Sequence, residues 1–464
     1  MKNKAIYITL SIYAVIATLV LFFFDGTGDA GDSVHHYLFA RYAPSHPELF
    51  FDHWAKPVYV LLASPFAQFG FIGVKIFNVL VMLFTLLFTF KIAQKLELKN
   101  AVLTSVFIVF APLCFALTFS GLTEPLFALF ISIGTYSVLK INYITASLII
   151  SFLPFIRSEG LIFLGVFALY FLLKKEWKAI PFLLFGHLAY SIAGYFVYDD
   201  LFWVFNKIPY AHLSSVYGKG GLFHYVDQLT YVIGIPIYVL LGLGTIGVIW
   251  KTVKKKITLE LQVLIFLGFF AFFTAHTLFW YLGIFNSMGL KRVFVGVMPL
   301  IAILALVGFN FLTEEVLGKR KSQQRIIQAL LIGLIFLFPF TSNPAALNLD
   351  RDLRLSVDQR TADEIGIYVH KKLGTDHRFL FSHPYLSEAL NIDHFDQTQH
   401  FGLDIPTLEQ SRSGDVVIWE NWFALVESGV TEEWLDSRTE FTHLYTARSD
   451  DRGREIIYSV YVRN

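Results

Sequence analysis

Cysteine and charge are what this sequence of 464 residues has least of. Its one cysteine, Cys114, lies in an apolar run, which leaves neither a disulfide framework nor a thiolate metal cluster to consider. Charged residues make up 16% of the chain, against roughly 25% in soluble domains. The net charge of +1 gives no overall field that would attract nucleic acid, so partners must be inferred from local sites.

Apolar residues take the place of the missing charge. The chain is 55% hydrophobic and 17% aromatic, and its mean hydropathy is +0.57. Runs long enough to cross roughly 30 Å of hydrocarbon recur from Ala5 to Phe340, which predicts a polytopic membrane protein. No small-residue cleavage site follows the first run, so we interpret it as an uncleaved span. The runs predict about eleven transmembrane helices, near residues 5–24, 71–90, 101–119, 124–139, 144–157, 160–173, 179–198, 230–250, 259–280, 292–310 and 326–341.

Basic residues mark every second break between these spans. If Lys2 lies in the cytoplasm, all the lysine-rich breaks do, and this is the positive-inside pattern. An odd number of spans then places the loops 25–70, 199–229 and 281–291, and the tail after Thr341, on the non-cytoplasmic side. The basic breaks contain Lys91, Lys95 and Lys99, then Lys140, then Lys174, Lys175 and Lys178, then Lys251, Lys254, Lys255 and Lys256, and finally Lys319, Arg320, Lys321 and Arg325.

The tail differs from the rest of the chain, with frequent Asp, Arg and Glu between short apolar runs. We therefore expect an all-α polytopic membrane domain over residues 1–341 and a small soluble α/β domain over residues 342–464, on the non-cytoplasmic side. Alternating runs predict strands near 378–381, 415–419 and 456–462, and helices are predicted near 358–373 and 431–435.

The first outward loop is more polar than a passive connector needs to be. Asp32, followed by Ser-Val-His-His, predicts a helix start, and on that helix Asp32 and His36 share a face at i, i+4. A carboxylate beside an imidazole can accept a proton or, with Asp29, bind a divalent metal such as Mg²⁺ or Mn²⁺. The alternative is that Asp32 only caps its helix and that the histidines lie among the lipid headgroups.

Two further breaks on the same side carry ionisable groups at membrane depth, where such groups are functional candidates. Glu124 precedes Pro125, and a plain helix start is the alternative there. Arg157 and Glu159 lie at the tip of a short hairpin, where an internal ion pair is the alternative to binding. A guanidinium presents a fixed fork of donors that suits phosphate.

Cations at the outward breaks run against the positive-inside pattern and favour an anionic ligand, although snorkelling to the interface is the alternative for Lys291. Trp54 and Tyr210 could contact sugar faces, and Trp54 could equally belong to an aromatic belt. The acids expected to do proton or metal work are Asp29, Asp32 and Glu124. The substrate-binding candidates are His35, His36, His53, Trp54, Lys56, Arg157, Glu159, Tyr210, His212, Lys219, Lys291 and Arg292.

This layout resembles the GT-C superfamily of polytopic membrane glycosyltransferases, including its mannosyltransferase-like members. The likeness covers the first ten or eleven spans and rests on the acids of the first loop, Ser-Gly-Leu-Thr-Glu-Pro-Leu-Phe at 120–127, Arg-Ser-Glu-Gly at 157–160, and Gly-Leu-Lys-Arg at 289–292. Such enzymes take sugars from polyprenyl- or dolichyl-phosphate carriers on the non-cytoplasmic side. The resemblance implies that Asp32, or Asp29 as second choice, is the general base and in some members a metal ligand.

We therefore expect a membrane glycosyltransferase that moves a hexosyl or pentosyl group, with inversion, from a polyprenyl-phosphate donor to a glycan, lipid or protein acceptor. The alternative is a transporter or flippase for a lipid-linked sugar or another anion, but such proteins tend to show internal repeats, and we find no repeat in the sequence. A purely structural scaffold would leave the acids of the first loop unexplained. Short loops favour the bacterial inner membrane over the endoplasmic reticulum.

Overall fold

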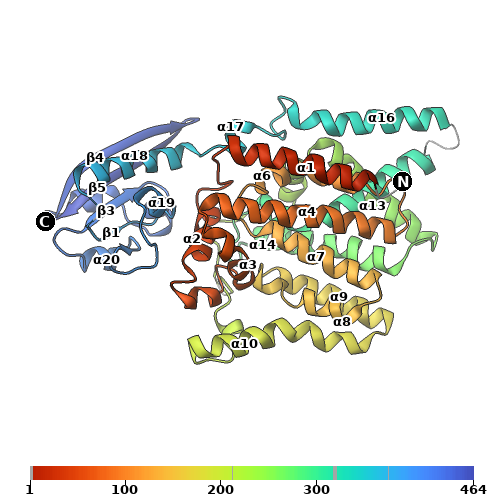
Figure 1. Ribbon diagram of the computed structural model, residues 1–464, viewed down its shortest axis with the longest axis horizontal. Helices are drawn as coiled ribbons and strands as arrows, with labels where there is room; N and C mark the ends of the chain where they lie inside the picture. The colour runs from red at the N-terminus through yellow and green to blue at the C-terminus, as the bar shows by residue number, and fades with distance from the viewer. Residues whose placement is uncertain (1–3, 212, 317–320, 375) are drawn as a thin grey trace.

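The computed structural model describes every residue of the chain except 1–3, 212, 317–320 and 375. Figure 1 shows a bundle of long, roughly parallel helices, with a small part that contains a β-sheet at one end of it. The N-terminal helix α1 (Lys4–Phe23) begins at the opposite end of the bundle. Seven helical segments of the described residues are long and apolar enough to cross a membrane, so the chain is an integral, multi-pass membrane protein.

The remaining predicted spans are shorter or interrupted. The predicted span 101–119 is two helices, α5 and α6, because Pro112 has no backbone N–H with which to continue the first one. The predicted span 230–250 is broken at Gly234, whose φ of +76° separates α12 from α13. The total of eleven crossings therefore stays a prediction. The bundle consists of α1, α4 (Phe71–Lys95), α5 (Leu103–Val109), α6 (Pro112–Leu117), α7 (Glu124–Leu139), α8 (Tyr143–Ile150), α9 (Gly160–Lys174), α10 (Phe185–Tyr198), α12 (His224–Ile233), α13 (Ile235–Val253), α14 (Gly268–Leu282), α15 (Met298–Asn310) and α16 (Lys321–Leu337).

The two sets of breaks lie at opposite ends of this bundle. Lysine-rich breaks contact one another: Lys99 pairs with Glu314 at 2.8 Å, and Lys174 pairs with Glu260 at 3.1 Å. At the other end, the first loop contacts the break after α6, where the backbone N–H of Gly121 donates to Ser33 Oγ at 2.7 Å. Breaks that alternate along the sequence between lysine-rich and lysine-poor therefore lie at alternate ends of the bundle.

The centre of the bundle is α15, which is buried along its length among the other helices. It packs closely against α13 because small residues face each other. A Cβ on Gly244 would come within 1.9 Å of the Leu304 carbonyl oxygen, and one on Gly308 within 2.0 Å of the Leu240 carbonyl oxygen. Only glycine permits this approach of the two backbones.

The first outward loop forms α2 (Asp32–Tyr42), a 3₁₀ turn (Pro47–Phe51) and α3 (Pro57–Ala67) between the bundle and the tail. The helix start predicted at Asp32 is confirmed. The N-cap is Gly31, which has no side chain, and Asp29 Oδ1 accepts hydrogen bonds from the N–H groups of Gly31 at 2.8 Å and Ser33 at 3.4 Å. Asp32 therefore does not cap this helix.

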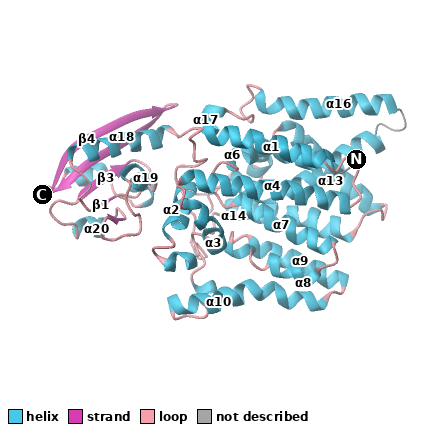
Figure 2. Ribbon diagram, in the orientation of Figure 1, coloured by secondary structure: helices cyan, strands magenta, loops and turns pink. Residues whose placement is uncertain are grey.

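The tail folds around a five-stranded sheet of order β2-β1-β3-β5-β4. Figure 2 draws its strands in magenta. Its parallel half is β1 (Phe379–Leu380) between β2 (His400–Phe401) and β3 (Val416–Glu420), and its antiparallel half adds β5 (Arg454–Arg463) and the edge strand β4 (Phe441–Asp451). The three predicted strands and both predicted helices are present. The edge strand β4 was missed because most of its side chains are polar or exposed, which hides the alternation. The helices are α17 (Leu349–Leu353), α18 (Val357–Lys372), α19 (Tyr385–Leu390), α20 (Ile405–Glu409) and α21 (Glu432–Asp436).

Candidate active site between the bundle and the tail

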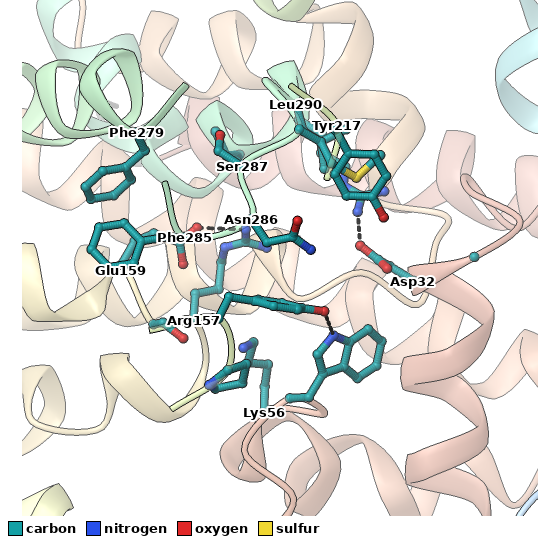
Figure 3. Close-up of a pocket in the computed structure, with 18 of the residues that line it drawn as sticks. Asp32, Lys56, Arg157, Glu159, Tyr217, Phe279, Phe285, Asn286, Ser287 and Leu290 are labelled. Atoms are coloured by element: carbon teal, nitrogen blue, oxygen red, sulfur yellow. Dashed lines mark hydrogen bonds and ion pairs between the residues drawn. The ribbon is translucent and has the colours of Figure 1, made fainter. Parts of the chain in front are cut away.

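A cavity of about 540 Å³ opens where the first loop, the loops before α12 and α15, the start of α9 and the tail come together (Figure 3). Aromatic, apolar and charged side chains line it, which is the usual make-up of a small-molecule site. Nine of the residues predicted from sequence are among its lining: Asp32, His35, His36, Trp54, Lys56, Arg157, Glu159, Tyr210 and Arg292.

Arg292 joins the two acids of the first loop. Its Nη1 donates to Asp29 Oδ2 and its Nη2 to Asp32 Oδ2, so one guanidinium holds both carboxylates. Because Asp29 Oδ1 also accepts from the N–H groups of Gly31 and Ser33, both oxygens of Asp29 are bonded, and Asp29 is not among the residues that line the cavity. The Asp32 side chain is 45% exposed and does line it. Asp32 is therefore the carboxylate of this pair that a substrate can reach.

A second ion cluster lies behind the first. Glu124, whose side chain is fully buried, forms an ion pair with Arg157: its Oε1 lies 2.9 Å from Arg157 Nη1. The same oxygen lies 3.6 Å from Arg292 Nε. Arg157 also donates to Glu159 Oε1 at 3.0 Å and to Thr123 Oγ1 at 3.2 Å. The position of Glu124 away from the cavity surface suits a residue that holds two arginines in place, not one that touches a substrate.

Lys56 is the cavity cation that is free of a carboxylate partner. Its Nζ donates to the His53 carbonyl oxygen at 3.3 Å, and no carboxylate of the described residues lies within ion-pair distance of it. Burial lowers the pKa of this ammonium to about 8, against an ordinary value of 10.5. The group still carries its charge at neutral pH, and an anion in the cavity would be its natural counter-charge.

Trp54 and Tyr210 form an aromatic wall. Trp54 Nε1 donates to the Tyr210 hydroxyl at 2.8 Å, and the Trp54 ring stacks on His36 with ring centroids 5.0 Å apart. The ring of His35 lies between Trp54 and His394 of the tail, at 4.9 Å and 5.0 Å. This wall offers flat apolar faces with polar edges, which suit a sugar ring.

Several predicted residues do not reach the cavity. Lys291 lies over the Tyr231 ring, 4.9 Å from its centroid, because adjacent residues of the 3₁₀ turn Lys291–Val297 point in different directions. The exposed Lys219 is not part of the lining. His53 is buried with Nε2 3.2 Å from the Val204 carbonyl oxygen. The prediction for His212 falls outside the described residues.

The predicted metal ligands do not assemble into a site. Within the part of the chain that the structure describes, no group of three or more His, Cys, Asp or Glu side chains converges as a metal would require. Asp29 and Asp32 converge on the Arg292 guanidinium instead, and His36 is stacked under Trp54. These residues do not fit Mg²⁺ or Mn²⁺, which prefer several oxygen ligands.

The cavity also has residues that the sequence did not single out. His276 on α14 is 6% exposed, and its Nε2 lies 3.6 Å from Glu159 Oε1. A histidine within a span is a signal that could have found it. Tyr217 donates to Glu427 Oε1 of the tail at 2.9 Å, and burial raises the pKa of Glu427. No local pattern marks Glu427, because only the fold brings the tail to this loop.

One wall of the cavity is apolar and reaches the outside of the bundle. Leu161 and Phe285 both line the cavity, and each is 45% exposed at the surface. Figure 3 shows Phe279, Phe285 and Glu159 on one side of the cavity and Asp32 with Tyr217 on the other. Arg157 lies between these two sides. Glu159 and the aromatic residues Phe279 and Phe285 thus lie across the cavity from Asp32.

Comparison with known proteins supports the fold and leaves the sequence family open. No protein-family model matches the chain, and no curated protein does. Among solved structures, the chain resembles ArnT from Cupriavidus metallidurans bound to undecaprenyl phosphate, with a TM-score of 0.59 and 11% identity over 97% of both chains. It also resembles the apo state of the same protein, with a TM-score of 0.61 and 10% identity over 97% of both chains. These two likenesses confirm the GT-C-like fold expected from the sequence, a polytopic helical domain followed by a small C-terminal α/β domain.

Proposed function

We propose that this chain is a membrane glycosyltransferase that takes a sugar from a polyprenyl-phosphate carrier and transfers it, with inversion at C1, to an acceptor hydroxyl. The observation that carries the proposal is the cavity, in which the half-exposed carboxylate of Asp32 shares one space with three cations and an apolar wall. The GT-C fold supports it, and so does the undecaprenyl phosphate bound to ArnT, which is a lipid-linked carrier of this kind.

The carrier phosphate would lie by Lys56 and Arg157. A sugar-linked phosphodiester has one negative charge, and the departing polyprenyl phosphate gains a second when its bond to C1 breaks. Lys56 has no carboxylate partner among the described residues, and Arg157 faces the same space, so both can stabilise that second charge. The lipid chain would leave past Leu161 and Phe285, where the cavity meets the lipid-facing surface.

The acceptor would bind at the other side, by Asp32. Asp32 takes the proton of the acceptor hydroxyl as that oxygen forms its bond to C1, and the electron pair of the broken bond passes to the phosphate oxygen. Arg292, which is bonded to both Asp29 and Asp32, keeps the Asp32 carboxylate oriented, while Trp54 and Tyr210 support the sugar ring. Arg292, bonded to two acids, is a positioning group in this scheme more than a phosphate ligand.

The sidedness of the site follows from the lysines. The lysine-rich breaks lie at the end of the bundle away from the tail, which supports a cytoplasmic location for them and a non-cytoplasmic one for the cavity. Residues 1–341 would then be the membrane domain and residues 342–464 an extracytoplasmic domain that covers the cavity. A bacterial inner membrane fits this arrangement. The mannosyl or other identity of the sugar, and the acceptor, depend on the shape of the aromatic wall.

The test is an Asp32→Asn variant in reconstituted membranes with a polyprenyl-phosphate-linked sugar and a hydroxyl acceptor. The matched control is Asp25→Asn, which changes an acid of the same loop whose Oδ1 only accepts from the Leu355 N–H at 3.2 Å. We expect Asp32→Asn to lose about 10² to 10⁴-fold in rate, the range of a general base, and the control to retain activity. Transfer by folded Asp32→Asn at the parent rate would refute the base assignment. Movement of intact lipid-linked sugar without C1 cleavage would identify a transporter.

A further inference from the structure

The acidic loop is hydrogen-bonded to a segment of the tail more than 300 residues away in sequence. The Gly26 N–H donates to the Leu353 carbonyl oxygen at 2.7 Å, and the Leu355 N–H donates to Asp25 Oδ1 at 3.2 Å. Gln359, in the first turn of α18, donates from Nε2 to Thr27 Oγ1 at 2.8 Å. The last of these contacts is buried, with Thr27 4% and Gln359 2% exposed.

Thr27 passes this contact on to the two acids. Its Oγ1 donates to the carbonyl oxygen of Asp29 at 2.8 Å, and its own carbonyl oxygen accepts from Ser33 Oγ at 2.6 Å. Ser33 Oγ accepts in turn from the Gly121 N–H, so the turn before α2 is held from the tail on one side and from the bundle on the other. The backbone of Asp29 and the start of Asp32's helix are thus fixed by bonds that converge on Thr27.

The chemistry of Gln359 is more specific than its local role requires. Its Oε1 accepts from the Ser356 N–H at 3.1 Å and completes a capping box at the start of α18. A capping box accepts Glu or Gln at this position, because only the side-chain oxygen is used. The capping box does not use the amide nitrogen of Gln359, and in the structure this nitrogen donates the hydrogen bond to Thr27.

We propose that Gln359 is a positioning residue, which acts through Thr27 to hold Asp29 and Asp32 in the geometry that Arg292 requires. The tail then contributes to catalysis, because its hydrogen bonds hold the acidic loop in position. This inference rests on the proposed function for the role of Asp32, but the positioning of the loop can be measured without any transfer reaction.

The experiment compares Gln359→Glu with Ser356→Ala in the full-length protein. Gln359→Glu keeps the oxygen of the capping box and removes the donor to Thr27, whereas Ser356→Ala weakens the cap and leaves that donor in place. In Gln359→Glu we expect amide hydrogen exchange over residues 25–33 to become about tenfold faster, the size of one buried hydrogen bond. We expect kcat to fall about tenfold or more with the KM for the donor within about twofold, because a misplaced base slows the chemical step.

Thr27 supplies a rescue that a purely structural role would not predict. Thr27→Ser keeps the hydroxyl and should behave as the parent. Thr27→Val removes both the acceptor for Gln359 and the donor to the Asp29 carbonyl oxygen, so its losses should be at least those of Gln359→Glu, and adding Gln359→Glu to Thr27→Val should cause no further loss. Parent-like exchange over residues 25–33 in folded Gln359→Glu would overturn the proposal, as would equal losses in Ser356→Ala. An inactive parent would refute the proposed function instead, while the exchange result would still decide whether Gln359 positions the loop.

Discussion

A single methyl group at Gly121 tests whether the placement of the acidic loop governs the reaction. A Cβ on this residue would lie 2.3 Å from the Ser33 carbonyl oxygen, and contacts of 3.0–3.4 Å are already tight. Relief requires a shift of about 1 Å, and a 1 Å misplacement of a catalytic group can cost about 100-fold in rate. Gly121 does not have a positive φ, so alanine brings no backbone strain of its own.

We therefore expect Gly121→Ala to fold and to lose about 100-fold in kcat. The matched control is Gly165→Ala on α9, since a Cβ there meets nothing within 4 Å. The assay is sugar transfer from a polyprenyl-phosphate donor in lipid nanodiscs, normalised to monodisperse protein, with thermal stability measured alongside. A Gly121→Ala protein as stable and as fast as the parent would show that the loop tolerates the shift, and the link from loop position to rate would be wrong.

Two further predictions concern the cations. Because burial lowers the pKa of Lys56 to about 8, its charged form is lost as pH rises through that value, so kcat/KM should fall above about pH 8. Lys56→Arg stays protonated and should move that limb to higher pH, and an unchanged pH profile would rule out Lys56 as its source. Substitutions of the adjacent residues Lys291 and Arg292 should differ in their effect on activity. Lys291→Ala leaves the cavity intact and should keep activity within about twofold. Arg292→Gln releases both acids and should lose about 100-fold or more in activity. Equal losses of activity in these two variants would contradict the conclusion that Arg292 lines the cavity and Lys291 does not.

The ion clusters show where local pattern was informative and where it misled. The sequence predicts either ligand binding or an internal ion pair for Arg157 and Glu159. In the structure Arg157 pairs with Glu159 and with Glu124 of α7, while Arg157 and Glu159 both also line the cavity. The sequence pattern predicts catalytic roles for Asp29 and Glu124. The structure places them behind Asp32 and the arginines, where they hold charges in position. Residue type and depth in the membrane could not distinguish a supporting acid from an exposed one.

Residue type also could not distinguish the roles of two residues that are adjacent in the sequence. Lys291 and Arg292 are equivalent as outward cations in the sequence, yet only Arg292 faces the acids. The difference depends on the direction in which each side chain leaves the 3₁₀ turn. Conversely, His276 could have been noticed as an imidazole within an apolar helix, but its closeness to Glu159 required the packing of α14 against the rest of the bundle.

The sequence alone determined the membrane, the alternation of the breaks and the helix start at Asp32, because hydropathy, charge and i, i+4 spacing act within one segment. Three of the five strands of the tail were also accessible to it for the same reason, but the edge strands β2 and β4 were not. Only the tertiary structure decided which acid is open, which cavity cation has no carboxylate partner among the described residues, that Glu427 lines the cavity, and that Gln359 contacts the acidic loop. Those properties depend on contacts between segments hundreds of residues apart, such as Thr27 with Gln359, and no local pattern encodes such a contact.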